Sequence, residues 1–267
     1  MTSMPIRVAV IGDVGGHVEE LRRELRALGA SETGVLPDDL VVIQVGDLVH
    51  RGPDSEAVVR LVNYYLNAYP GQWVQLAGNH EALYLRPNSF LWEDRIGYLE
   101  QRILKKWWAD GKLHAAVAVE TGDEDFLVTH AGVTEQFWRE HLLAPGTARQ
   151  AARRINSLAR TGCPTLYGGG AMLGPPNPMA GPLWASRNDE LIPGWEGTTL
   201  PFSQVHGHSG SHGESDHPTT TYDARLHHEE TRFPGGRLIG IDPGHLVEAN
   251  PMWGAFVVTT GSRPTVA

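Results

Sequence analysis

Five short polar motifs contain the residues of this chain that are best suited to bind a metal. Each follows an apolar run rich in β-branched residues: GDVGGH at 12–17, GDLVHRG at 46–52, GNHE at 78–81, THAG at 129–132 and VHGH at 205–208. Their carboxylate, amide and imidazole side chains, without a thiolate, suit manganese, iron or zinc. We therefore expect one metal centre built from five separate segments.

Two neighbouring cations need a shared ligand, and Asp47 is the candidate because each oxygen of a carboxylate can bind one ion. Asp13 would hold the first cation. The second would be held by Asp47 together with Asn79, His130 and His208. Asn79 is neutral, so the second cation would keep its Lewis acidity. Two cations in this arrangement activate a water molecule for attack on phosphorus. The motifs therefore predict a phosphoester hydrolase.

Two further residues in the motifs are suited to catalysis. His80, next to Asn79, is placed to protonate the leaving alkoxide. Arg51 is suited to bind two phosphate oxygens at once. We therefore predict His80 and Arg51 as catalytic residues, with Arg51 and Asn79 in contact with the phosphate.

The first third of the chain alternates strand and helix signals. Buried strands are predicted at 8–11, 40–45 and 73–76, and amphipathic helices at 18–28 and 55–68. This order predicts a right-handed parallel unit, in which the loops after the strands gather at one edge of the sheet. The first three motifs lie in those loops, so the predicted architecture brings their side chains together.

The rest of the chain is expected to complete a single α/β domain over residues 1–267. The pattern predicts a mostly helical segment at 81–112, a strand pair at 113–119 and 126–128, a helix at 150–159, and strands at 202–205, 237–241 and 255–260. Two polar or Gly/Pro-rich segments are predicted as loop insertions, one over the site at 161–182 and an exposed one at 210–233.

Composition limits the function classes. The net charge of −9 argues against non-specific binding to a nucleic acid polymer or to an anionic membrane. No apolar run reaches the roughly 18 residues of a membrane span. The single Cys163 favours a reducing compartment, and we expect a cytoplasmic protein. The sequence does not indicate an oligomeric state.

With these motifs the chain resembles the calcineurin-like metallophosphoesterases, over roughly residues 6–245. It is most similar to the branch of bacterial Ser/Thr phosphatases and symmetrical diadenosine tetraphosphatases. The matching segments are 46–53, 78–81, 129–132 and 207–209. The resemblance implies a four-layer α-β-β-α sandwich, with two divalent or mixed-valence metal ions between the two sheets.

Two positions depart from that family. The family has a histidine ligand to the first metal two residues after the first aspartate, and this chain has Gly15. The family also has an aspartate that orients the catalytic histidine, and this chain has His50 at that position. One imidazole is therefore lost and another gained, so the first metal site is a variant.

Three interpretations of the variant first site remain. In the first, His50 becomes a ligand, because the related purple acid phosphatases also have that glycine and place a tyrosine ligand three residues after their bridging aspartate, the spacing of His50 from Asp47. In the second, His17 is the substitute, four residues after Asp13. In the third, His50 only pairs with His80 or solvent, and the first site is weak or empty.

The resemblance also implies a phosphate-binding arginine near a Leu-Trp pair. Arg187, after Leu183 and Trp184, is the candidate. The substrate is expected to be a phosphoprotein or a phosphorylated small molecule, with a dinucleoside polyphosphate as one option. The rival hypothesis, motivated by Gly15, is a non-catalytic descendant that binds a metal or a phosphorylated ligand.

Overall fold

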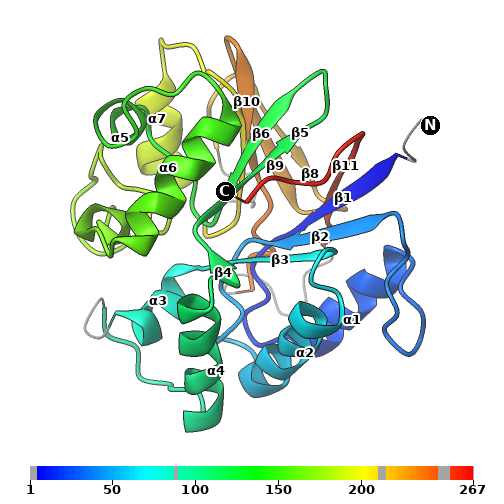
Figure 1. Cartoon of the computed structure of the whole chain (residues 1–267). Coiled ribbons are helices and arrows are strands. Elements are labelled where there is room, and N and C mark those ends of the chain that lie inside the picture. Colours follow the sequence, from blue (N-terminus) through cyan, green and yellow to red (C-terminus); the bar gives the residue numbers. More distant parts are fainter. Residues whose placement is uncertain (1–4, 87–89, 210–214, 246–252, 267) are drawn as a thin grey trace.

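Two β-sheets face each other in the computed structural model, which describes residues 5–86, 90–209, 215–245 and 253–266 (Figure 1). Within these residues the first sheet has five strands, in the order β11 (Phe256–Thr260), β1 (Ile6–Ile11), β2 (Leu40–Gln44), β3 (Trp73–Leu76) and β4 (Leu113–His114). The second has six, in the order β5 (Ala116–Glu120), β6 (Asp125–Thr129), β7 (Ser203–His206), β10 (Gly236–Gly240), β9 (His228–Phe233) and β8 (Thr220–Asp223).

Helices cover the outer face of each sheet (Figure 1). The first sheet is covered by α1 (Val18–Ala27), α2 (Ser55–Ala68), α3 (Asn79–Leu85) and α4 (Tyr98–Ala109). The second is covered by α5 (Glu135–Glu140), α6 (Ala148–Arg160) and α7 (Ile192–Trp195), with a 3-10 helix at Pro164–Tyr167 and a π-helix at Arg187–Leu191. The predicted four-layer α-β-β-α sandwich is confirmed. No helix of the described segments is long and apolar enough to cross a membrane.

Strand β1 explains why the core has two parts. Val8 and Val10 belong to the apolar cluster between the sheets, whereas the alternate residues Ala9 and Ile11 belong to the larger cluster that includes the helices. Side chains alternate across a strand, so a strand covered on both faces must be apolar throughout. The continuous apolar runs of the sequence therefore indicated central strands correctly.

The predicted strand at 113–119 is wrong in one respect. The structure divides it into β4, which joins the first sheet, and β5, which joins the second, with the fully buried Ala115 between them. Asn156 of α6 holds this crossing: its Oδ1 accepts the N–H groups of Ala115 at 2.9 Å and Ala116 at 3.1 Å. Its Nδ2 donates to the carbonyl of Ala116 at 2.9 Å.

The two predicted loop insertions differ in outcome. Segment 161–182 contains a 3-10 helix and no strand, as expected of a long connection. The sequence predicts segment 210–233 as a loop, but residues 220–223 and 228–233 form β8 and β9, which pair antiparallel and extend the second sheet. Residues 210–214 lie outside the described residues. Polar, β-branched strands at a sheet edge lack the apolar run that marks a central strand.

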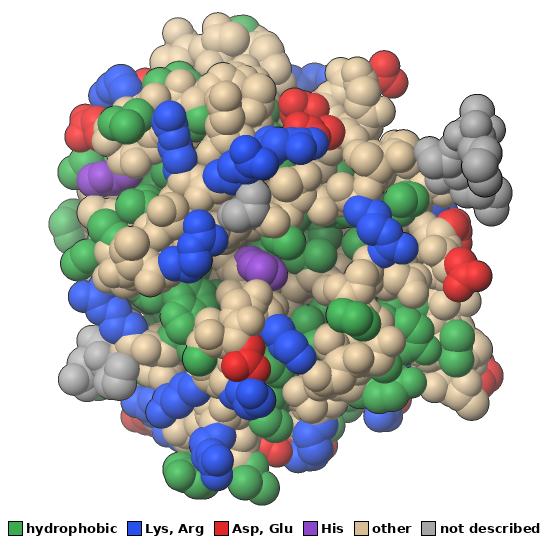
Figure 2. Space-filling view, viewed as in Figure 1, with side chains coloured by type: hydrophobic (Ala, Val, Ile, Leu, Met, Phe, Trp, Pro, Cys, Tyr) green, Lys and Arg blue, Asp and Glu red, His purple; other side chains and the backbone are tan. Residues whose placement is uncertain are grey.

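One face of the molecule carries many basic side chains. Figure 2 shows lysine and arginine side chains scattered over the face where α4 and α6 flank β4. The net charge of the whole chain is nevertheless −9.

Replacing Asn156 with alanine should destabilise the fold. The variant leaves the buried N–H groups of Ala115 and Ala116 without their acceptor, and we expect a loss of about 3 kcal/mol in the free energy of unfolding. Equilibrium unfolding in urea measures it. The exposed Asn67→Ala serves as the control and should change little; an equal effect of the two variants would contradict the assignment.

Candidate metal centre

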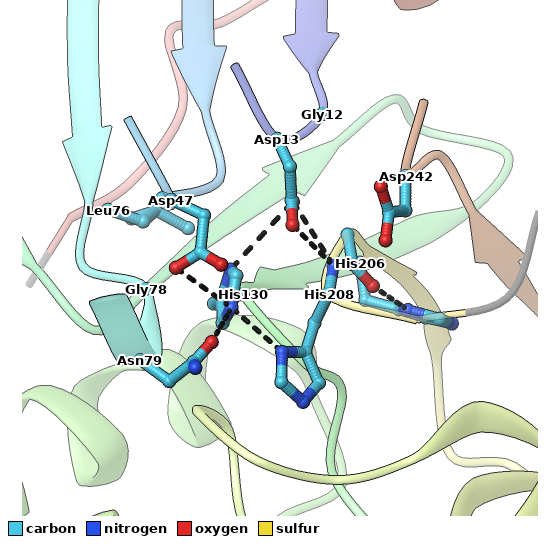
Figure 3. A network of polar contacts seen from close by, with 12 residues as sticks. Gly12, Asp13, Asp47, Leu76, Gly78, Asn79, His130, His206, His208 and Asp242 are labelled. Atoms are coloured by element: carbon cyan, nitrogen blue, oxygen red, sulfur yellow. Dashed lines mark hydrogen bonds and ion pairs between the residues drawn. The ribbon is translucent and has the colours of Figure 1, made fainter. Parts of the chain in front are cut away.

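The carboxyl ends of three parallel strands in each sheet meet in one place (Figure 3). Each strand is followed by one side chain that can bind a metal: Asp13 after β1, Asp47 after β2, Asn79 after β3, His130 after β6, His208 after β7 and Asp242 after β10. Parallel strands of one sheet end at the same edge, and ligand sites form there. The junction of two such edges places donors from six segments together.

Four possible metal-donor atoms lie close together, one of them from His130. Its Nε2 lies 2.9 Å from Oδ1 of Asn79, 3.2 Å from Nδ1 of His208 and 3.5 Å from Oδ1 of Asp47. None of the four side chains is more than 3% exposed. A single cation could therefore contact one carboxylate, one amide and two imidazoles.

The electrostatics and the unpartnered atoms fit a cation. Burial lowers the pKa values of His130 and His208, so both imidazoles are neutral near pH 7, the form that binds metals. Asp47 Oδ2 and His208 Nε2 are buried without a hydrogen-bond partner among the described residues. Such atoms are rare in folded proteins, and this donor set suits a borderline divalent metal.

Asp13 lies beside this group and is repelled by two neighbouring carboxylates, Asp242 and Asp47. Burial, and then the charges of Asp242 and Asp47, raise the pKa of Asp13 well above its usual range. The N–H of His208 donates to both of its oxygens, at 3.1 and 3.2 Å. A cation between these carboxylates would remove the repulsion. Asp242 is not among the ligands predicted from the sequence, although it follows an apolar strand as the other donors do.

Comparison with known proteins agrees with this geometry. A family model described as calcineurin-like phosphoesterase matches residues 6–230. The chain belongs to the calcineurin-like phosphoesterase family. Over 99 residues it is 33% identical to the zinc-dependent endopolyphosphatase of Saccharomyces cerevisiae, a match that covers 36% of this chain and 28% of that protein. The chain therefore matches less than a third of the length of that relative.

Two solved structures share the fold of this phosphoesterase. A cold-active protein-tyrosine phosphatase of a psychrophilic Shewanella species has a TM-score of 0.54 at 17% identity, covering 95% of this chain and 75% of that one. A protein serine/threonine phosphatase of Saccharomyces cerevisiae has a TM-score of 0.50 at 14% identity, covering 98% and 84%. At these identities the likeness concerns the fold alone.

The loop that carries Asp47 has an unusual backbone. Asp47, His50 and Arg51 have positive φ angles of 51°, 74° and 66°, which non-glycine residues adopt only when their surroundings compel them. Glu81 supplies part of that constraint: its carboxylate accepts the N–H of Asp47 at 2.7 Å and of Leu48 at 2.9 Å. Burial and the neighbouring Asp47 raise the pKa of Glu81 to about 8. Sequence reasoning had included Glu81 in a motif without assigning it a role.

His50 lies against His80. Its Nδ1 is 2.5 Å from Nδ1 of His80, and its Nε2 is 2.6 Å from the hydroxyl of Tyr84. Both ring nitrogens are thus engaged by protein groups, as in the interpretation in which His50 pairs with His80. His17 lies elsewhere, in a cluster with Glu20 and His245. These positions lend no support to His50 as a ligand of the first cation.

The predicted phosphate-binding arginines have different surroundings. Arg51 acts electrostatically on both Asp13 and Asp47, and its Nε is buried with no partner in the described part of the chain. Arg187 is fully buried. Its guanidinium faces Glu229 at 3.3 Å and donates to His206 Nε2 at 3.1 Å. A phosphate contact by Arg187 would require breaking this ion pair, so its position lends the prediction no support.

His206 should make the metal-free protein acid-sensitive. Burial, and then the Arg187 cation, lower its pKa to about 3, against 6.5 in the unfolded chain. Its stabilising effect is therefore complete above pH 6.5 and is lost as the pH falls towards 3. Between pH 7 and pH 5 the free energy of unfolding should fall by about 2 kcal/mol more in the wild type than in His206→Gln. Urea unfolding in chelator measures both, and parallel pH profiles would contradict the prediction.

Proposed function

We propose that this protein hydrolyses phosphoesters by attack of a water molecule, without a covalent enzyme intermediate. The observation that carries the proposal is the convergence of Asp47, Asn79, His130 and His208 on one point, with Nε2 of His80 3.8 Å from Oδ2 of Asp47. The donors suit a cation and His80 suits proton transfer, so the arrangement combines the two requirements of the reaction.

Asp47 would be shared by two cations, with Asp13 on the first and Asn79, His130 and His208 on the second. Manganese, iron or zinc bound there would supply Lewis acidity for activating water and positive charge for the phosphate oxygens. The zinc-dependent relative favours zinc among these metals. Asp47 could serve both cations, because its Oδ1 faces His130 whereas its Oδ2 is unpartnered among the described atoms.

His80 would donate a proton to the leaving oxygen from Nε2. Burial raises the pKa of Tyr84, which therefore remains a hydroxyl donor. If that hydroxyl donates to Nε2 of His50, then Nδ1 of His50 carries the proton and donates to Nδ1 of His80. Before substrate binds, the proton of a neutral His80 is then on Nε2, where the Asp47 carboxylate favours an N–H. Burial lowers the pKa of His80 to about 4. Because a neutral imidazole is too weak an acid, His80 would first take up a second proton, favoured by the negative charge of the bound phosphate, and would donate as the imidazolium. His50 would thus replace the usual aspartate as the group that orients His80.

Arg51 and Asn79 would bind the phosphate group. The guanidinium of Arg51 has an unpartnered, buried Nε and lies within electrostatic reach of both aspartates, which suits paired hydrogen bonds to phosphate oxygens. Oδ1 of Asn79 faces His130, so its amide N–H groups remain for a phosphate oxygen. Arg187 has no part in this proposal.

The substrate is proposed to be a small phosphorylated molecule or the end of a polyphosphate chain. The metal-binding side chains are at most 3% exposed, and aromatic rings lie beside the site. Trp92 and Phe90 lie 4.5 and 5.5 Å from the ring of His80, and Trp184 lies 5.8 Å from that of His208. The burial of the ligands favours a small phosphoester over a folded phosphoprotein, and the endopolyphosphatase relative adds polyphosphate as a candidate.

Replacing Asp47 with asparagine should abolish both metal binding and hydrolysis. Its carboxylate is the proposed shared ligand, and an amide offers no charge to hold two cations. The measurements are metal content by mass spectrometry and turnover, with manganese or zinc, of p-nitrophenyl phosphate, short polyphosphate and a phosphorylated protein.

Wild-type protein that binds metal but turns over none of these substrates would favour the non-catalytic alternative. Turnover confined to the phosphorylated protein would keep the hydrolase and contradict the proposed substrate class.

Replacing His80 with asparagine should slow turnover without removing the metal. Loss of a general acid costs about 10²–10⁴-fold in kcat, whereas no donor atom of the centre belongs to His80. Initial rates and metal content are measured on the same preparation, with His114→Asn as a control outside the site. A proportional loss of rate and metal would refute the role of His80.

A further inference from the structure

A second group of metal-ligating side chains lies beside the Asp13 loop. His17 directly precedes α1, Glu20 is in its first turn, and His245 follows β10. One ligand atom from each lies within 4.8 Å of the others. Nδ1 of His17 is 3.5 Å from Oε1 of Glu20, and Nε2 of His245 is 3.9 Å from Oε2. None of these atoms belongs to the Asp47 centre.

The polar side-chain atoms of His245 and Glu20 are buried and largely unpartnered, whereas the side chain of His17 is 19% exposed. The side chain of His245 is 2% exposed, and neither of its ring nitrogens has a hydrogen-bond partner within the described segments. The side chain of Glu20 is 9% exposed. Its Oε2 accepts the indole N–H of Trp253 at 2.7 Å, while Oε1 has no such partner. Buried polar atoms without partners call for a ligand.

The two imidazoles lie beside the same carboxylate. Their rings are stacked, with centroids 4.1 Å apart and planes inclined by 11°, and one nitrogen of each lies near a Glu20 oxygen, at 3.5 and 3.9 Å. Burial, and then the neighbouring His17, lower the pKa of His245 to about 4, and a neutral imidazole is the form that binds metals.

Gly15 connects this group to the variant first motif. A side chain at position 15 would begin 3.6 Å from Cδ2 of His245. The imidazole of His245 therefore stands beside the place where the usual family ligand would start. Gly15 also has a φ of +50°, which disfavours a larger residue. The missing histidine at position 15 thus coincides with an imidazole supplied from the other end of the chain.

We propose that His17, Glu20 and His245 bind a divalent cation of the zinc type, at a site separate from the Asp47 centre. Two imidazoles and one carboxylate form a common zinc ligand set, which leaves a fourth position for water or another ligand. The cation would tie the segment around His245 to the start of α1 and so hold the loop that carries Asp13. This site does not depend on the proposed reaction.

Metal titration of full-length protein tests the proposal. Chelator-treated wild type, Glu20→Gln and His245→Gln are titrated with Zn²⁺ and then analysed for bound metal after gel filtration. Each variant should bind one equivalent less than the wild type. His141→Gln, which removes an imidazole outside both groups, should bind as much as the wild type. Equal metal content in the wild type and both variants would overturn the proposal.

A variant with a damaged Asp47 centre distinguishes metal binding at the two sites. In His208→Asn, Co²⁺ should still give the visible absorption bands of a site with nitrogen and oxygen ligands, and adding Glu20→Gln should abolish them. Bands that persist in the double variant would place the bound ion elsewhere and overturn the proposal.

Thermal unfolding shows whether the variants still fold. In chelator, Glu20→Gln should melt as the wild type does, because an amide can still accept from Trp253. Added Zn²⁺ should raise the melting temperature less in the variant. If His245→Gln does not fold, the test is made with Glu20→Gln alone. An equal rise in melting temperature on adding Zn²⁺ to Glu20→Gln and to the wild type would refute the site.

Discussion

The burial of three carboxylates at one junction is the constraint on which this structure depends. Asp13, Asp47 and Asp242 are each at most 5% exposed, and burial, followed by repulsion from Asp242 and Asp47, raises the pKa of Asp13. Desolvated like charges are tolerated only where cations or donors compensate them. Arg51 and the N–H of His208 compensate in part, and a metal would supply the rest. A fold that places three buried carboxylates close together is suited to binding cations.

The backbone around the junction is held in place by buried hydrogen bonds. Glu81 accepts three backbone N–H groups, from Asp47, Leu48 and Gly78, and thus connects the loops after β2 and β3. The positive φ of Asp47 has its counterpart in His208, whose φ is 64°. Strain of this kind persists where the surrounding contacts determine the conformation. The backbone that carries Asp47 and Asn79 is therefore constrained by contacts within the protein.

The two departures from the family pattern have a common physical consequence. At position 50, an imidazole that is paired with His80 and Tyr84 replaces an anion, so no negative charge at that position stabilises a protonated His80. At position 15, a missing imidazole coincides with His245 beside His17. In both places the histidines redistribute charge and donors around an unchanged set of Asp47, Asn79, His130 and His208.

The sequence alone determined the central strands, the order of the motifs and the convergence of Asp13, Asp47 and Asn79. Each of these residues directly follows an apolar run, and the ends of parallel strands must meet at one sheet edge. His130 and His208 follow strands of the second sheet, so their approach to these three residues depends on how the two sheets pack. Only the tertiary structure decided the partners of His50, the burial of Arg187 and the roles of Asp242, Glu81 and His245. It also divided residues 113–120 between the two sheets. Such features depend on side-chain direction and on contacts between distant segments, such as that of Glu20 with Trp253, and local sequence pattern contains neither.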